Sequence, residues 1–349
     1  MGNSSSSSSG KYKKISSGES KASSSSSSSK NKKKYQMVDF ALHGPKHLPP
    51  NWCQNEEHQY AVAACFINGV YVLEHERRQG RSKDDHVLAR PWWDSFGYTL
   101  LQTLVDPDEG VIFGAIYLRV AAPESAPQMV MAFRGMVAGW DEISDPNTPS
   151  SSHIFSNTFS GMLKVALALQ NTGSLGYYSK HGGAWLCGHS LGAAMGLIAG
   201  KFLATSGTYL DTFFFNPPIV LYYLRKGQLD FYTKSLWNDP IGLIAWNMFI
   251  LAHKEYISNE GGKGFDNLVK WQPRLLVNPG DFICNGYIDY YEDRDSTKEA
   301  CQLELSLPFV NPSACLVLNV GSTEECHGIK QWWDRNLNVE RRPYVCVSD

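Results

Sequence analysis

Short apolar runs, each closed by Gly, Pro, Asn or Asp, recur along the chain and predict buried strands. These runs are 110–120, 128–133, 184–187, 212–215 and 274–277. Longer segments with apolar residues on one side predict helices over 56–75, 157–170 and 191–204. Near-continuous apolar strands suit a sheet that is covered on both faces, and strands that alternate with helices are typical of parallel sheets. The pattern therefore predicts an α/β fold with a mainly parallel central sheet flanked by helices.

The first 36 residues do not show this pattern. Sixteen of the first 34 residues are serine, and eight lysines accompany a single acid, Glu19. This segment therefore carries a charge of +7 in a chain whose formal net charge is −2. It has too little apolar surface to offset the entropy lost on ordering. We therefore predict a disordered Ser/Lys-rich tail over 1–36 and a folded domain over 37–349.

The start of this tail fits an N-myristoylation pattern, with Gly2 as the acceptor and Ser6 at the hydroxyl position. One acyl chain holds a protein to a membrane only marginally, but a nearby group of lysines can supply the second signal. The tail would then attach the protein peripherally to a membrane. In the other interpretation, the pattern arises by chance in a serine tract and the lysines only keep the tail solvated.

The charge, the apolar stretches and the cysteine spacing of the chain argue against a nucleic-acid-binding protein, a membrane-spanning protein and a zinc protein. A charged fraction of 19% and a net charge near zero give no sign of nucleic-acid binding. The longest apolar stretch, Ile241–Ala252, is shorter than the ~20 residues needed to span a bilayer. The eight cysteines include no Cys-x-x-Cys pair and no paired spacing typical of a zinc site. We therefore expect buried thiols, no metal or organic cofactor, and a cytoplasmic protein.

A Gly-x-Ser-x-Gly pattern spans 188–192, between the strand predicted at 184–187 and the helix predicted at 191–204. This pattern is the nucleophile elbow, in which a serine stands on a sharp strand-to-helix turn and the flanking glycines make room for the tight backbone. The pattern alone is weak, but its position between an apolar strand and a helix rich in small residues favours Ser190 as a nucleophile. The alternative is a glycine-rich loop without chemistry.

A serine nucleophile needs a base, and the base needs an acid that orients it. In chains with this elbow, the three residues follow the order Ser, Asp or Glu, then His. Only His253 and His327 follow Ser190. His253 lies in an apolar, helix-like stretch, whereas His327 lies in a loop near the C-terminal end. We therefore predict that His327 is the base.

Asp281 is the predicted acid because it directly follows the strand at 274–277. Catalytic residues of open α/β sheets gather beyond the carboxyl ends of the strands. Asp211 precedes its strand and should lie at the opposite edge. The other aspartates considered follow no predicted strand; they are Asp230, Asp239, Asp266 and Asp289.

Two backbone N–H groups should stabilise the oxyanion that forms when a serine attacks an ester. One is the N–H of Leu191, at the N-terminus of the predicted helix. The other is expected after an earlier strand, and the strand that ends in Phe133-Arg134-Gly135 points to the N–H of Met136. These assignments predict a serine hydrolase.

These motifs together resemble those of the fungal-type class 3 lipases, and especially of the plant lipase-like α/β-hydrolases in that group. The similarity runs from about Phe40 to Trp333 and includes the sequences Phe-Arg-Gly (133–135), Gly-His-Ser-Leu-Gly (188–192) and Asn-Pro-Gly-Asp (278–281). It also includes Gly44-Pro45, Trp92-Trp93, 113–117 and 331–333. The resemblance implies an α/β-hydrolase fold, a Ser190–Asp281–His327 triad, and acylglycerols or related lipid esters as substrates.

One residue departs from the pattern of the class 3 lipases. Those lipases usually have serine or threonine after Phe-Arg-Gly, where this chain has Met136. Two alternatives therefore stay open: a catalytically weak protein that binds a lipid or a partner in the same cleft, and an acyltransferase that uses the same triad. The segment 221–270 could form a lid over the site, or it could be an ordinary pair of buried helices.

Overall fold

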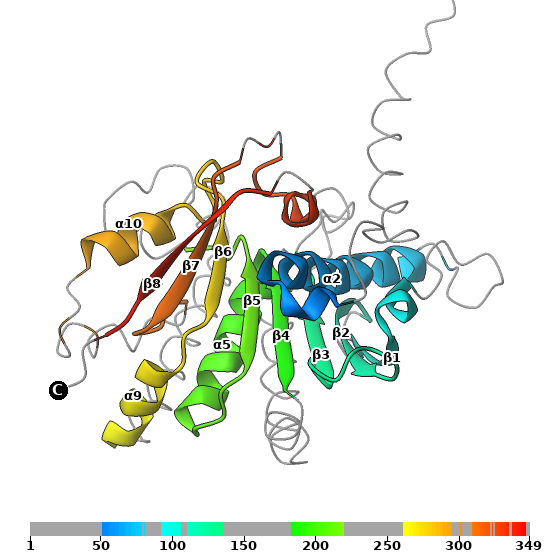
Figure 1. Ribbon diagram of the computed structural model, residues 1–349, viewed down its shortest axis with the longest axis horizontal. Coiled ribbons are helices and arrows are strands. Elements are labelled where there is room, and N and C mark those ends of the chain that lie inside the picture. Colours follow the sequence, from blue (N-terminus) through cyan, green and yellow to red (C-terminus); the bar gives the residue numbers. More distant parts are fainter. Residues whose placement is uncertain are drawn as a thin grey trace, which may run out of the picture. The chain divides into compact units, whose positions relative to one another are not determined.

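In the computed structural model, residues Val38–Asp349 form one compact unit, and the segments described below all belong to it (Figure 1). The described residues are 51–78, 80, 92–105, 110–135, 183–219, 261–294, 297, 301, 309–321, 323, 325–334 and 337–346. The predicted tail with Gly2, the helix expected over 157–170 and the part of the lid candidate at 221–260 lie outside these residues.

The described strands form one mixed sheet, in which they lie side by side in chain order. Their bounds are β1 Tyr98–Val105, β2 Ile112–Arg119, β3 Met129–Phe133, β4 Ala184–His189, β5 Asp211–Phe215, β6 Arg274–Val277, β7 Ala314–Asn319 and β8 Val339–Tyr344. β3 to β7 run parallel, while β1 and β2 at one side and β8 at the other pair antiparallel. The predicted α/β architecture with a mainly parallel sheet is confirmed in these residues.

The register of the parallel strands aligns their carboxyl ends. His189 at the end of β4 lies opposite Phe215 at the end of β5, and Val277 at the end of β6 lies opposite Leu318 in β7. The chain therefore leaves all these strands at the same edge of the sheet. That edge is where side chains from distant parts of the sequence can meet.

Consecutive residues of β5 show that helices cover both faces of the sheet. Phe213 packs edge-on against Tyr60 of α2 (Glu56–Arg78), whereas Phe214 lies against Gly196 of α5 (Leu191–Thr205). Successive side chains of a strand point to opposite faces, so α2 and α5 pack on opposite faces. The other helical elements are η1 Trp52–Gln54, η2 Trp92–Phe96, α9 Gly261–Lys270, α10 Gly286–Asp293 and η4 Ile329–Trp333.

All five predicted strands are present, and β4 continues two residues further than predicted, to His189. The sequence analysis did not predict β1, β7, β8 or α10. None of the helices in the described ranges is long and apolar enough to cross a membrane.

Gly192, in the first turn of α5, allows this helix to begin directly against the end of β3. A Cβ atom at this position would lie 2.5 Å from the carbonyl oxygen of Arg134 and 2.6 Å from that of Phe133. Both oxygens belong to the backbone and cannot rotate away as a flexible side chain could. The elbow glycine is therefore required by packing between two elements.

We predict that Gly192→Ala lowers the free energy of unfolding by about 3 kcal/mol, because β3 and α5 must separate to admit the methyl group. Gly207→Ala is the control. Gly207 has φ +78°, and a Cβ there would meet only Asn267 Nδ2, at an ordinary contact distance of 3.7 Å, so its backbone conformation should account for a cost of about 1 kcal/mol. Urea unfolding measures both losses, and equal losses would contradict the packing argument.

Candidate active site

Ser190 occupies the turn between β4 and α5. Its backbone has φ 54° and ψ −124°, a conformation that residues other than glycine rarely adopt. The N–H of Ser190 donates to the carbonyl oxygen of Phe215 in β5 at 2.9 Å, which fixes the turn to the neighbouring strand. The turn places the partly exposed serine at the carboxyl edge of the sheet, as the nucleophile elbow predicts.

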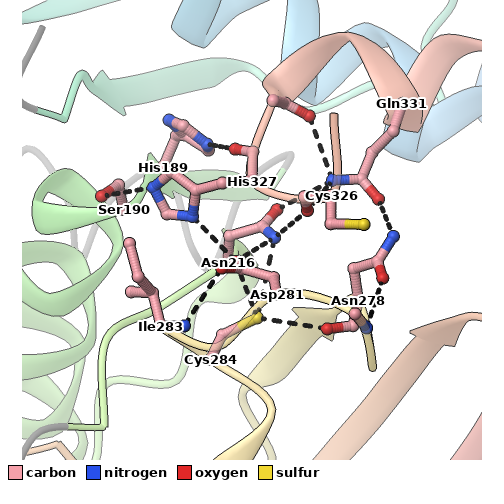
Figure 2. Close-up of polar contacts among 12 residues, drawn as sticks. His189, Ser190, Asn216, Asn278, Asp281, Ile283, Cys284, Cys326, His327 and Gln331 are labelled. Carbon is pink, nitrogen blue, oxygen red and sulfur yellow. Dashed lines mark hydrogen bonds and ion pairs between the residues drawn. The ribbon is translucent and has the colours of Figure 1, made fainter. Parts of the chain in front are cut away.

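The structure brings Ser190, His327 and Asp281 into one chain of hydrogen bonds (Figure 2). His327 Nδ1 lies 2.7 Å from Asp281 Oδ2, and His327 Nε2 lies 3.0 Å from Ser190 Oγ. An ionised carboxylate only accepts hydrogen bonds, so the proton of a neutral His327 belongs on Nδ1. Nε2 is then free to accept the proton of the serine hydroxyl, which is the arrangement that a general base needs.

Asp281 lies in the turn that follows β6 and is 2% exposed. Its Oδ2 also accepts hydrogen bonds from Asn216 Nδ2 at 2.7 Å and from Cys284 Sγ at 3.1 Å. Burial alone would raise the pKa of this carboxyl, but the hydrogen bonds from His327, Asn216 and Cys284 outweigh burial and hold the pKa below its usual value. Asp281 is therefore ionised at neutral pH.

A cluster of buried amide side chains lies behind Asp281 and His327. Its members come from the ends of β5, β6 and β7 and from η4; they are Asn216, Asn278, Asn319 and Gln331. Gln331 Oε1 accepts from Asn278 Nδ2 at 2.6 Å and from Asn319 Nδ2 at 3.0 Å. Gln331 Nε2 donates to the carbonyl oxygen of Cys326 at 2.6 Å. The cluster thus attaches the loop that carries His327 to three strand ends.

Asn216 joins this amide cluster to the aspartate. Its Nδ2 donates to Asp281 Oδ2 and to the carbonyl oxygen of Cys326, and its Oδ1 accepts from Trp332 Nε1 at 2.9 Å. The sequence analysis did not single out Asn216 or Gln331. The sequence does contain a pattern that could have pointed to Asn216: like Asn278, it directly follows a strand and precedes a proline.

Charged side chains fix Arg134 and Gly135, which follow β3 and precede the expected oxyanion donor Met136; we call these two residues and Met136 the oxyanion loop. Arg134 donates from Nε to the carbonyl oxygen of Ile112 and from Nη1 to that of Gly135, both at 2.7 Å. Glu74 in α2 accepts from the N–H of Ile112 at 2.9 Å and also pairs with Arg77. These contacts hold the backbone up to Gly135. Met136, the expected oxyanion donor, lies outside the described residues.

Leu191, the other expected oxyanion donor, is the first residue of α5. The first N–H groups of a helix have no acceptor within the helix, and they carry the partial positive charge of the helix dipole. The N–H of Leu191 therefore lies directly beside Ser190 with the polarity that an oxyanion requires.

The structure also places some of the other candidates. Asp211 begins β5, at the opposite edge of the sheet from Ser190, and pairs with Arg274, as its position before the strand predicts. Asp266 lies in α9 and Asp289 in α10. The remaining candidates lie outside the described residues; they are His253, Asp230 and Asp239.

The structure describes every cysteine of the chain, and none of them forms a disulfide. All eight cysteines are free thiols, and Cys326 is the one that is partly exposed. Within the described segments, no group of three or more His, Cys, Asp or Glu residues is arranged to hold a metal ion.

Together, the α/β fold and the hydrogen-bonded Ser190–His327–Asp281 arrangement are typical of a serine hydrolase. No family model matches this chain. The chain is 30% identical over 342 residues to the GDSL esterase/lipase At4g10955 of Arabidopsis thaliana, in a match that covers 88% of this chain and 97% of that protein. The chain belongs to the same esterase/lipase family as this plant protein and is a carboxylic ester hydrolase.

We predict that Asn216→Asp slows ester hydrolysis at neutral pH by about 10–100-fold. The new carboxyl would lie where an amide now donates to Asp281 at 2.7 Å. Two carboxylates this close resist simultaneous ionisation, so the pKa of Asp281 rises. The acid limb of the pH–rate profile should therefore move to higher pH. Asn216→Ala removes the hydrogen bond without adding charge and should move that limb less.

Asn216→Asp should also change how the stability of the protein depends on pH. The pKa of Asp281 is lower in the folded protein, so its contribution to stability is fully present above the unfolded value of about 3.9. That contribution is lost as the pH falls through the lower, folded pKa. In Asn216→Asp the raised pKa of Asp281 shrinks this contribution, so stability at neutral pH should be lower and should decline less on acidification, as pH-dependent thermal unfolding would show. A pH–rate profile like that of the wild type would contradict this role of Asn216.

Proposed function

We propose that this enzyme hydrolyses lipid-like carboxylic esters through Ser190 as the nucleophile, His327 as the general base and Asp281 as the residue that orients His327. The observation that carries the proposal is the continuous hydrogen-bonded chain from Ser190 Oγ through both ring nitrogens of His327 to Asp281 Oδ2. The membership of an esterase/lipase family supports the same reaction class.

In the proposed reaction, Ser190 Oγ attacks the ester carbonyl carbon while its proton moves to His327 Nε2. The tetrahedral oxyanion is stabilised by the N–H groups of Leu191 and Met136. When the carbonyl reforms, the ester bond breaks, and His327 gives its proton to the departing alcohol oxygen. Water then attacks the acyl-enzyme, with His327 again as the base, and releases the acid and the free serine.

We further propose an α/β-hydrolase of the class 3 lipase type, with acylglycerol-like esters as substrates. Three sequences support this placement: Phe-Arg-Gly at 133–135, Gly-His-Ser-Leu-Gly at 188–192 and Asn-Pro-Gly-Asp at 278–281. The chain contains no Gly-Asp-Ser-Leu sequence, and the residue before its serine is His189. Phe282, directly after Asp281, is 53% exposed and offers apolar surface next to the site, as a substrate with an acyl chain would require.

Ser190→Ala should abolish ester hydrolysis and covalent labelling by a fluorophosphonate probe, because no other group in the proposed mechanism can form the acyl-enzyme. Thermal unfolding should remain close to that of the wild type. A series of esters with increasing acyl length separates a lipase from a short-chain esterase. Normal hydrolysis by the folded variant would refute the assignment of Ser190.

The same series, run with an added alcohol as acceptor, tests for acyl transfer. Formation of a new ester in place of the free acid would indicate an acyltransferase with the same triad. A folded wild-type protein that is not labelled at all would favour the lipid-binding alternative, which Met136 keeps open.

We also propose that the N-terminal tail holds the enzyme at a membrane surface through myristoylation of Gly2 and through its lysines. The support is the sequence pattern at 1–6 together with the +7 charge of the first 34 residues. In a eukaryotic host, Gly2→Ala should leave the hydrolytic rate on soluble esters unchanged and move the protein from the membrane fraction to the soluble fraction. An intact mass without the added acyl group in the wild-type protein would refute this proposal.

A further inference from the structure

His189, the residue before the nucleophile, is only 6% exposed, and both of its ring nitrogens form hydrogen bonds. Nε2 lies 2.8 Å from the carbonyl oxygen of His327, a contact that Figure 2 shows. Nδ1 lies 2.7 Å from the hydroxyl oxygen of Tyr71 in α2. The proposed mechanism assigns no task to either contact.

The partners of His189 determine which nitrogen carries its proton. A carbonyl oxygen can only accept, so Nε2 must donate to His327. Burial, followed by the effect of the nearby His327, lowers the pKa of His189 to about 3, so the ring is neutral and has a single proton. Nδ1 therefore accepts, and the hydroxyl of Tyr71 donates to it.

The chain of hydrogen bonds continues beyond Tyr71 to the loop after β3. The N–H of Gly135 donates to the hydroxyl oxygen of Tyr71 at 2.7 Å. A Cβ atom on Gly135 would lie 2.8 Å from that oxygen and 2.7 Å from Ser190 Cβ, so only glycine permits this close approach. The bonds thus run in one direction, from Gly135 N–H to Tyr71, to His189 and to the His327 carbonyl.

The His327 carbonyl is one of three consecutive loop carbonyls that accept side-chain hydrogen bonds. The Cys326 and Gly328 carbonyls accept from Gln331 Nε2 at 2.6 and 3.1 Å. Gln331 lies in η4, so it fixes this loop to the chain that directly follows it. His189 instead connects a carbonyl of this loop to the turn that carries the nucleophile.

We infer that His189 is a positioning residue, which holds the main chain of His327 at the distance from Ser190 that proton transfer requires and which joins it through Tyr71 to the oxyanion loop. This inference rests on the proposed function of Ser190 and His327. Asp281 then holds the ring of His327, and His189 holds its backbone, so the base is fixed at two points. A displacement of about 1 Å can slow such a reaction 10²-fold.

The test compares His189→Gln with His189→Leu in the full-length enzyme. The amide of glutamine can donate to the His327 carbonyl and accept from Tyr71, whereas leucine can do neither. We expect His189→Leu to lower kcat and the rate of fluorophosphonate labelling by about 10–100-fold, with little change in KM. We expect His189→Gln to stay within about fivefold of the wild type.

Tyr71→Phe provides a second, independent measurement, because it removes the hydroxyl that links Gly135 to His189. It should also lower kcat, and its effect should be much smaller when leucine already replaces His189, since both changes break the same chain of bonds. This variant keeps the inference testable if His189→Leu does not fold.

The outcomes separate this inference from the proposed function. A wild-type protein that is folded but not labelled overturns both. Normal labelling of the wild type, with kcat unchanged in folded His189→Leu and Tyr71→Phe, overturns only the role of His189. Equal losses in His189→Gln and His189→Leu, or full additivity with Tyr71→Phe, would also overturn it, because a general packing defect explains these results.

Discussion

The parallel pairing of β3 to β7 is the constraint on which the site depends. Because these strands end at one edge of the sheet, the turn after β4, the turn after β6 and the loop after β7 open at the same place. They carry Ser190, Asp281 and His327, which lie far apart in the sequence. A change of register between two of these strands would move one side chain of the triad by a residue or more, and the hydrogen-bonded chain would break.

The strand ends bring the triad residues close together, and hydrogen bonds from buried amide side chains then fix the positions of Asp281 and of the loop that carries His327. The carboxylate of Asp281 lies at the centre of these contacts, and Asn216 and Cys284 donate to it together with His327. Behind it, Gln331 donates to the carbonyl oxygens of Cys326 and Gly328, and Asn216 also donates to the first of these. Neutral amides suit this task, because an additional buried charge would compete with His327 for the aspartate.

The sequence was sufficient to predict the central strands and the three residues that the structure brings together, because their motifs are local: a glycine-flanked serine, an aspartate after a strand, and a late loop histidine. Supporting contacts such as that of Gln331 depend on side chains that meet only after folding, so no local pattern reveals them. The edge strands β1 and β8 were missed because their residues alternate irregularly between buried and exposed. β7 is a fully buried apolar run, so its omission was an error of interpretation.

Ser190 must be an activated nucleophile for the proposed reaction to proceed. The most direct measurement is peptide mapping by mass spectrometry after the folded wild-type protein has reacted with a fluorophosphonate. We expect one phosphonate adduct, on the peptide that contains Ser190, and none on that peptide in a folded variant with His327→Ala. An adduct on a different residue, or an unmodified Ser190 in the folded wild-type protein, would contradict this expectation.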